Sequence, residues 1–179
     1  MADQAPTDTS DGSGADDLAP LVDLARRIQE TMLDRGLKLA TAESCTGGLI
    51  GHVLTEISGS SGYYVGGAVS YSNAVKESAL GVDSTTLEKH GAVSAQTCVA
   101  MAEGARRAFV ADVAVAVTGI AGPRGGSDAK PVGLTYVGVA DSAGHDVRRF
   151  VWDSDRHGNK VRSAEAALTL ILDRLRASA

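Results

Sequence analysis

The sequence has few cysteines and none of the segments that direct a chain out of the cytoplasm. Two cysteines, Cys45 and Cys98, cannot supply the disulfide framework of a small secreted protein. The first residues are acidic, whereas a secretory signal needs positive charge followed by an apolar stretch. No apolar run approaches the roughly 20 residues of a membrane-spanning helix. These absences predict a cytoplasmic protein with reduced thiols and no membrane partner.

Positive charge and metal-ligand motifs are also scarce. The chain carries 17 Lys and Arg against 22 Asp and Glu, a net charge of -5, which gives no attraction to nucleic acid. The four histidines stand apart from one another, and no CxxC or HxxxH pair offers two ligands at zinc spacing. We therefore expect no metal, no cofactor and no nucleic-acid partner.

The composition that remains is that of an ordinary globular protein. With 179 residues, 44% of them apolar and 22% charged, the chain fits one domain with a real core. Residues 1–18 consist mainly of Asp, Ser, Thr, Gly and Pro and have almost nothing to bury. We expect a disordered N-terminal tail over 1–18 and a single domain over 19–179.

Two hydrophobic periodicities alternate along the domain. Helical spacing of apolar residues alternates with short β-branched or apolar runs, and two such runs come late, around a turn at 141–144. The pattern predicts a three-layer α/β/α sandwich around a mixed, mostly parallel sheet with a late antiparallel hairpin. The expected strands are 37–42, 65–70, 113–117, 134–140 and 147–152, and the expected helices are 21–36, 48–57, 73–80, 94–109 and 161–175.

The first unusual loop is 42-AESCTGG-48, between an expected strand and an expected helix. Ser44 lies where the strand turns into the helix, so its hydroxyl can project from the sheet edge. Thr46, Gly47 and Gly48 would leave peptide N–H groups unobstructed at a helix N-terminus, which favours an anion. Simple helix capping by Ser44 and Thr46 is the alternative.

The second loop is 67-GAVSYSNAVKESALG-81, in which Tyr71 follows a strand. Asn73 is the expected helix cap, which places Lys76 in the first turn. The helix dipole disfavours a cation there and would lower the pKa of Lys76 toward the neutral, proton-accepting amine. The alternative is a solvated lysine paired with a surface glutamate.

The third loop is 117-VTGIAGPRGGSDAKPVG-133, directly after the most apolar strand. Its glycines allow the backbone to approach a ligand closely, and Thr118 offers a hydroxyl at the strand end. The loop contains neither GxxxxGK[ST] nor GxGxxG. A merely flexible loop is the alternative, although flexible loops rarely hold two prolines.

Together the loops offer a serine, a candidate lysine base, a tyrosine hydroxyl and glycine N–H donors. Serine is inert at its free pKa and needs a neighbouring base. None of the three loops contains a histidine, which disfavours a Ser-His-Asp triad. A Ser-Lys pair remains, suited to acyl transfer such as amide hydrolysis with loop N–H groups holding the oxyanion.

Several motifs, in order from about Leu21 to the end of the chain, resemble the CinA C-terminal domain family. They are AESCTGG at 42–48, GGAVSYSNAVK at 66–76, HGAVS at 90–94, VAVTGIAGPRGGS at 115–127 and KPVG at 130–133, with Asp155-Arg156 similar to the family's closing motif. The best-defined activity of that family is hydrolysis of the carboxamide of nicotinamide mononucleotide, giving nicotinate mononucleotide and ammonia in pyridine-nucleotide salvage.

The resemblance implies a role for each matching residue. Ser44 would be the nucleophile, with Tyr71 and Lys76 activating it. Arg124 departs from the family, which usually has glycine there, and would either bind phosphate or obstruct the site. The predicted substrate-binding residues are Thr46, Gly47, Gly48, Asn73, Thr118, Gly119, Ala121, Gly122 and Arg124.

The resemblance also bears on partners and on a competing function. We expect a small-molecule substrate, nicotinamide mononucleotide, and a homo-oligomer. Long members of the family carry a further N-terminal domain linked to ADP-ribose cleavage, and that activity is not transferred to this chain. The rival hypothesis is a nucleotide-binding or regulatory module without catalysis.

Overall fold

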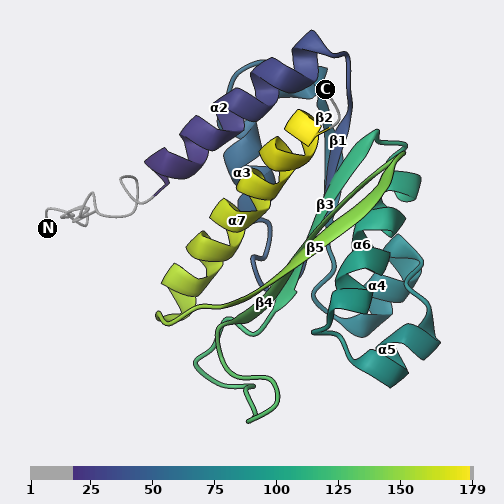
Figure 1. Cartoon of the computed structure of the whole chain (residues 1–179), viewed down its shortest axis with the longest axis vertical. Helices are drawn as coiled ribbons and strands as arrows, with labels where there is room; N and C mark the ends of the chain where they lie inside the picture. The colour runs from purple at the N-terminus through teal and green to yellow at the C-terminus, as the bar shows by residue number, and fades with distance from the viewer. Residues whose placement is uncertain (1–17, 178–179) are drawn as a thin grey trace, which may run out of the picture.

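The computed structural model describes residues 18–177, which fold around one five-stranded sheet (Figure 1). The strand order is β2-β1-β3-β4-β5, and β1 pairs in parallel with both β2 and β3. Strand β4 is antiparallel to both of its neighbours, β3 and β5. The mixed sheet and the late hairpin are therefore confirmed. The strands are β1 (Leu39–Glu43), β2 (Tyr64–Val69), β3 (Val113–Gly119), β4 (Leu134–Asp141) and β5 (Gly144–Val151).

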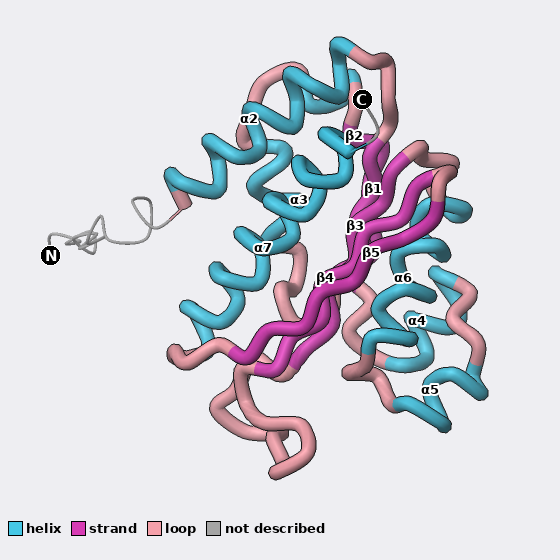
Figure 2. Tube along the Cα trace, in the orientation of Figure 1, coloured by secondary structure: helices cyan, strands magenta, loops and turns pink. Residues whose placement is uncertain are grey.

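Helices cover both faces of the sheet, so the predicted three layers are confirmed (Figure 2). One face carries α2 (Ala19–Asp34), α3 (Leu49–Thr55) and α7 (Arg156–Ala177), with the short 3-10 helix η1 (Ser60–Gly62) between α3 and β2. The other face carries α4 (Asn73–Leu80), α5 (Ser84–His90) and α6 (Ala95–Ala108).

The three largest differences between the expected elements and the structure are a helix that was not expected and two elements that start earlier. Helix α5 was not predicted; Asp83 begins it by accepting a hydrogen bond from the Thr85 N–H at 2.8 Å. Helix α7 starts at Arg156 rather than 161, because the Asp155 carboxylate accepts from the Gly158 N–H at 2.7 Å and caps the first turn. Strand β5 starts at Gly144 because the hairpin turn has only two residues, 142 and 143.

The two central strands are buried on both faces, as their short apolar runs predict. Leu39 and Val115 belong to the apolar cluster beneath α2, α3 and α7. Ala40 and Ala116 point to the other side and belong to the cluster beneath α6. The smaller side chains on the α6 side allow that helix to lie close to the sheet.

Helix α4 packs directly on α6 through a glycine. A Cβ atom built at Gly104 would lie 2.0 Å from the carbonyl oxygen of Leu80, far inside van der Waals contact. Only glycine therefore permits this approach of the two helices. The contact fixes the position of α4, whose side chains include Lys76.

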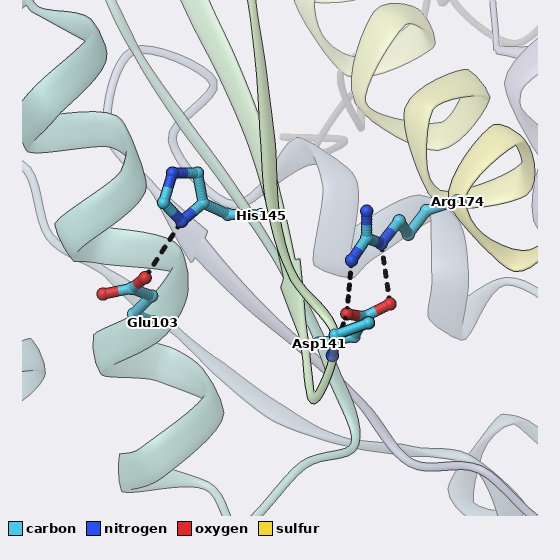
Figure 3. Close-up of polar contacts among 5 residues, drawn as sticks. Glu103, Asp141, His145 and Arg174 are labelled. Carbon is cyan, nitrogen blue, oxygen red and sulfur yellow. Dashed lines mark hydrogen bonds and ion pairs between the residues drawn. The ribbon is translucent and has the colours of Figure 1, made fainter. Parts of the chain in front are cut away.

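The β4–β5 hairpin is held from both faces at its turn (Figure 3). On one side Arg174 of α7 donates two hydrogen bonds to the Asp141 carboxylate, the Nε–Oδ2 bond being 2.7 Å long. On the other side His145 Nδ1 lies 3.1 Å from the Glu103 carboxylate of α6. These contacts join the hairpin to both helical layers.

Two expectations concern the rest of the chain. The predicted disordered tail, 1–18, lies outside the described residues except for Leu18. Between residues 18 and 177, no helix has the length and apolar character needed to cross a membrane.

Candidate active site

A pocket of 280 Å³ opens at one edge of the sheet, where the parallel strands β2, β1 and β3 end together. Loops after neighbouring parallel strands meet at such an edge, which is where ligands bind in open α/β sheets. The pocket therefore lies where the three unusual sequence loops converge. It is lined by Ser44, Cys45, Tyr71, Lys76, Ala92, Val93, Thr118, Gly119, Ile120, Ala121, Gly122, Arg124, Gly125 and Arg156.

Ser44 and Lys76 meet at the base of this pocket. Ser44 follows β1, and its N–H donates to the Val117 carbonyl of β3 at 2.9 Å, which fixes the backbone at the strand end. The Lys76 ammonium lies 3.2 Å from Ser44 Oγ and 2.6 Å from the Ser70 carbonyl oxygen. The Lys76 side chain is almost fully enclosed, with 1% of the residue exposed. The solvated-lysine alternative is thereby excluded.

Burial lowers the pKa of Lys76, while the neighbouring Cys45 acts in the opposite direction. The direction is the predicted one, and its largest cause is burial, whereas the prediction rested on the helix terminus. Ser72, not Asn73, caps α4, since its hydroxyl accepts from the Val75 N–H at 3.3 Å. Enclosure of the ammonium away from water disfavours its charged form. Asn73 is exposed and does not line the pocket.

The pKa of the adjacent Cys45 thiol is shifted in the opposite direction from that of Lys76. Burial raises its pKa to about 12, with the Glu43 carboxylate adding to the effect, although nearby peptide N–H groups lower it. The thiolate is the nucleophilic form of cysteine. Cys45 therefore remains a neutral thiol near pH 7, whereas the Ser44 hydroxyl lies beside the Lys76 amine.

The N-terminus of α3 is occupied by a side chain of the protein itself. The Glu43 carboxylate accepts hydrogen bonds from the N–H groups of Gly48, Ile50 and Gly51 at 3.0, 3.1 and 2.8 Å. The predicted free anion site at Gly47 and Gly48 is therefore wrong. Glu43 belongs to the AESCTGG motif, but no role was predicted for it from the sequence.

Thr46 also differs from its predicted role as a substrate contact. Its residue is fully buried, and its hydroxyl has no hydrogen-bond partner among the described residues. Capping of α3 by Ser44 or Thr46, the other alternative, is not seen either, because the cap residue Gly48 has no side chain and Glu43 receives the N–H groups. Thr46 thus belongs to the folded turn and not to the pocket wall.

Tyr71 and Arg156 form the mouth of the pocket. The Tyr71 hydroxyl accepts a hydrogen bond from Arg156 Nη2 at 3.0 Å, and Tyr71 is 60% exposed. Arg156 Nη1 donates to the Gly122 carbonyl at 2.8 Å. The tyrosine is thus held by α7 rather than by the amine of Lys76. Its predicted part in activating the serine stays a prediction.

The loop after β3 supports a further segment of the wall. Thr118 Oγ1 donates to the Ala92 carbonyl at 2.7 Å, and Lys130 Nζ donates to the His90 carbonyl at 2.9 Å. These bonds hold the connection between α5 and α6, which contributes Ala92 and Val93 to the pocket. These residues belong to the HGAVS motif, for which no role was predicted from the sequence.

A second cavity of 680 Å³ adjoins the first and shares Ala121 and Arg156 with it. Its wall includes the first turn of α7, with Arg156, His157 and Lys160, together with Asp155. The Asp155 carboxylate is engaged in capping α7. The basic groups beside this cavity can therefore face an anionic part of a ligand.

The structure brings most of the predicted site residues together. Those that line the pocket are Ser44, Tyr71, Lys76, Thr118, Gly119, Ala121, Gly122 and Arg124. Those that do not are Thr46, Gly47, Gly48 and Asn73. Among the described residues no group of His, Cys, Asp or Glu is arranged to hold a metal ion.

The fold and this site define an α/β protein with a buried serine–lysine pair at the carboxyl edge of a mixed sheet. Residues 21–175 match the family described as "CinA C-terminal domain". The chain belongs to that family.

Relatives with similar sequences support the same family assignment. A "CinA-like protein" of Chloroherpeton thalassium is 50% identical over 159 residues, which cover 87% of this chain and 38% of that protein. A "CinA-like protein" of Chlorobaculum tepidum is 48% identical over 160 residues, covering 87% and 38%. The chain thus spans well under half the length of these relatives.

Two crystal structures share the fold. The competence/damage inducible protein CihA from Agrobacterium tumefaciens is 44% identical with a TM-score of 0.83, covering 88% of this chain and 96% of that one. A CinA superfamily protein from Klebsiella pneumoniae is 29% identical with a TM-score of 0.84, covering 87% and 98%. The mixed five-stranded α/β architecture is therefore that of the CinA superfamily.

Proposed function

We propose that this protein hydrolyses the carboxamide of nicotinamide mononucleotide to nicotinate mononucleotide and ammonia. The observation that carries the proposal is the 3.2 Å contact between Lys76 Nζ and Ser44 Oγ in a pocket at the sheet edge. Burial lowers the pKa of that lysine, which favours the neutral amine needed to accept a proton. A Ser-Lys pair of this kind serves acyl transfer.

In the first step Ser44 Oγ attacks the carboxamide carbon while its proton passes to Lys76 Nζ. The carbonyl oxygen becomes an oxyanion, for which peptide N–H groups of the pocket wall, those of Ala121, Gly122, Arg124 and Gly125, are the proposed donors. The C–N bond then breaks as Lys76 returns the proton to the departing nitrogen. The products of this half-reaction are ammonia and an ester of Ser44.

In the second step water hydrolyses the ester. Lys76, neutral again, accepts a proton from the attacking water, and the acyl C–O bond to Ser44 breaks. The proton returns to Ser44 Oγ, and nicotinate mononucleotide is released. Lys76 thus alternates between base and acid, and a pKa lowered by burial makes its proton easier to give up.

The cavity beside the serine supports a mononucleotide in preference to free nicotinamide. The 280 Å³ pocket lies near the lower end of the roughly 300–1,000 Å³ of ligand pockets, but the adjoining 680 Å³ cavity extends it. Arg124 lines the smaller pocket, Lys160 the larger, and Arg156 both. We assign the phosphate to these basic groups, since Glu43 occupies the α3 N-terminus.

One assay tests this proposal. Ammonia release from nicotinamide mononucleotide should be measured alongside mass-spectrometric identification of nicotinate mononucleotide. Wild type should release both products in equal amounts, and Ser44→Ala should release neither while still binding the nucleotide in calorimetry. Binding without turnover in wild type would instead support the nucleotide-binding module. Full turnover by Ser44→Ala would reject the serine mechanism.

A further inference from the structure

The carboxylate of Glu43 has no part in the proposed chemistry, yet it is enclosed one residue before Ser44, with 2% of Glu43 exposed. Its Oε2 accepts from the N–H groups of Gly48 and Ile50, and its Oε1 accepts from that of Gly51. The first N–H groups of a helix have no partners within the helix. One side chain therefore receives three N–H donors at the start of α3, of which that of Ile50 is buried and those of Gly48 and Gly51 are part-buried.

These contacts close the nucleophile turn, residues 44–47, at both of its ends. The turn leaves Glu43 through the backbone and returns to the Glu43 carboxylate through Gly48. Inside it, the Gly47 N–H donates to the Ser44 carbonyl at 3.1 Å. Gly47 and Gly48 have φ of 66° and 97°, the left-handed region in which glycine is unhindered. Such glycines leave the turn many conformations unless a contact selects one.

The backbone of Glu43 also connects to the lysine. The Ser70 N–H donates to the Glu43 carbonyl oxygen at 2.7 Å. The Ser70 carbonyl in turn accepts from Lys76 Nζ at 2.6 Å. Glu43, at the end of β1, therefore contacts both the turn that carries Ser44 and the residue, Ser70, whose carbonyl accepts from the Lys76 amine.

We infer that Glu43 is a positioning residue, whose carboxylate holds the Ser44 turn so that Oγ stays within reach of Lys76. The inference rests on the proposed function for the part played by Ser44. Removing the carboxylate leaves one buried and two part-buried N–H donors without this acceptor and releases the glycine-rich turn. Attack on a carbonyl demands close alignment, so a displaced serine reacts more slowly, whereas the basic groups around Arg156 and Lys160 still bind the substrate.

The variant Glu43→Gln tests this role with little change of shape. Glutamine keeps one acceptor oxygen but turns its NH₂ donor toward an N–H group that needs an acceptor. We expect kcat with nicotinamide mononucleotide to fall by about 10- to 100-fold, and KM to stay within about threefold. Glu43→Asp, which keeps the charge on a shorter arm, should fall between this variant and wild type. It also serves as the second variant if Glu43→Gln does not fold.

A matched control separates positioning from general stability. Ile50→Val trims a fully buried side chain of the same helix but preserves the Ile50 N–H that Glu43 accepts. It should lower the melting temperature while leaving kcat within about twofold of wild type. Equal kcat values for wild type and Glu43→Gln would overturn the inference. So would a fall in kcat that follows the melting temperature identically in both variants.

A reagent that needs no nucleotide makes the test independent of the substrate. A small alkyl fluorophosphonate reacts when the Ser44 oxygen bonds to phosphorus, fluoride leaves and the serine proton passes to Lys76. Intact-mass measurement should show labelling of wild type, labelling about 10- to 100-fold slower in Glu43→Gln, and none in Ser44→Ala. Equal labelling rates in wild type and Glu43→Gln overturn the role of Glu43. A labelled wild type that releases no ammonia rejects the substrate only, and the labelling rates still decide the role of Glu43.

Discussion

A buried lysine at one end of the sheet and an arginine at the other differ in the groups that surround their positive charges. At the carboxyl edge Lys76 is enclosed, and the oxygens that it contacts, on Ser44 and Ser70, are neutral. At the far edge Arg174 donates twice to the Asp141 carboxylate (Figure 3). Burial lowers the pKa of Lys76, whereas hydrogen bonding to Asp141 raises the pKa of Arg174. A cation paired with a carboxylate joins two elements, while one surrounded by neutral oxygens can release its proton.

The largest expected effect comes from replacing the pocket lysine, Lys76, by arginine. Lys76→Arg keeps a positive charge but cannot give up its proton, so it should reduce kcat by about 10³-fold or more, nearly as much as Lys76→Ala. Steady-state kinetics of both variants check this. A Lys76→Arg enzyme that keeps most of its rate would show that Lys76 acts through charge alone.

The lowered pKa of Lys76 should appear in the pH dependence of both kcat and the unfolding free energy. The neutral amine of Lys76 is the active form, so kcat should rise about tenfold per pH unit below its depressed pKa and then level off. Stability should change in the same direction. Between that pKa and the roughly 10.4 of an unfolded lysine, the unfolded chain binds more protons, so the unfolding free energy rises with pH.

Lys76→Met provides the control for this pH dependence. It should remove the contribution of Lys76 to the rise in unfolding free energy, as measured by denaturant titration at several pH values. A variant whose stability changes with pH in the same way as wild type would contradict the assignment.

At the far edge the expected effect is on stability rather than on rate. Asp141→Asn removes a charge from the paired hydrogen bonds with Arg174 and should cost about 1–3 kcal/mol of unfolding free energy. The nucleotide kinetics should remain at wild-type values, since Asp141 lies at the opposite edge of the sheet from Ser44. Urea titration and steady-state assays measure the two quantities separately, and a fall in kcat would show coupling between the edges.

The smallest effect should come from the other contact at the hairpin. Glu103 and His145 are 44% and 47% exposed in their side chains, so water screens their interaction. Glu103→Gln should change the unfolding free energy by less than about 1 kcal/mol near pH 7. A larger loss would show that the Glu103–His145 contact stabilises the fold as much as the Asp141–Arg174 contact does.

The strands could be predicted because their signals are local, and the Ser44–Lys76 pair because each residue follows a strand and neighbouring parallel strands end at the same sheet edge. Apolar runs mark β1 and β3, and the loops that follow them carry the unusual side chains. The Tyr71–Arg156 contact could not be predicted, since 85 residues separate the two in the chain.

The roles of Glu43 and Ser72 were missed for a different reason. Several polar side chains near each helix start can cap it, and only the folded geometry decides which one reaches the N–H groups. The sequence could suggest an anion at the α3 N-terminus but not that the anion is the preceding glutamate. The same ambiguity led to the prediction that Asn73, rather than its neighbour, caps α4.

The contact between Gly104 and Leu80 has a genetic consequence. Lys76 is carried by α4, and α4 rests on α6 where even a methyl group would collide with the Leu80 carbonyl. A Gly104→Ala allele would push α4 outward and carry the amine away from Ser44 without altering any pocket residue. A selection for inactive alleles should therefore recover changes at this buried helix crossing, away from the residues that line the pocket.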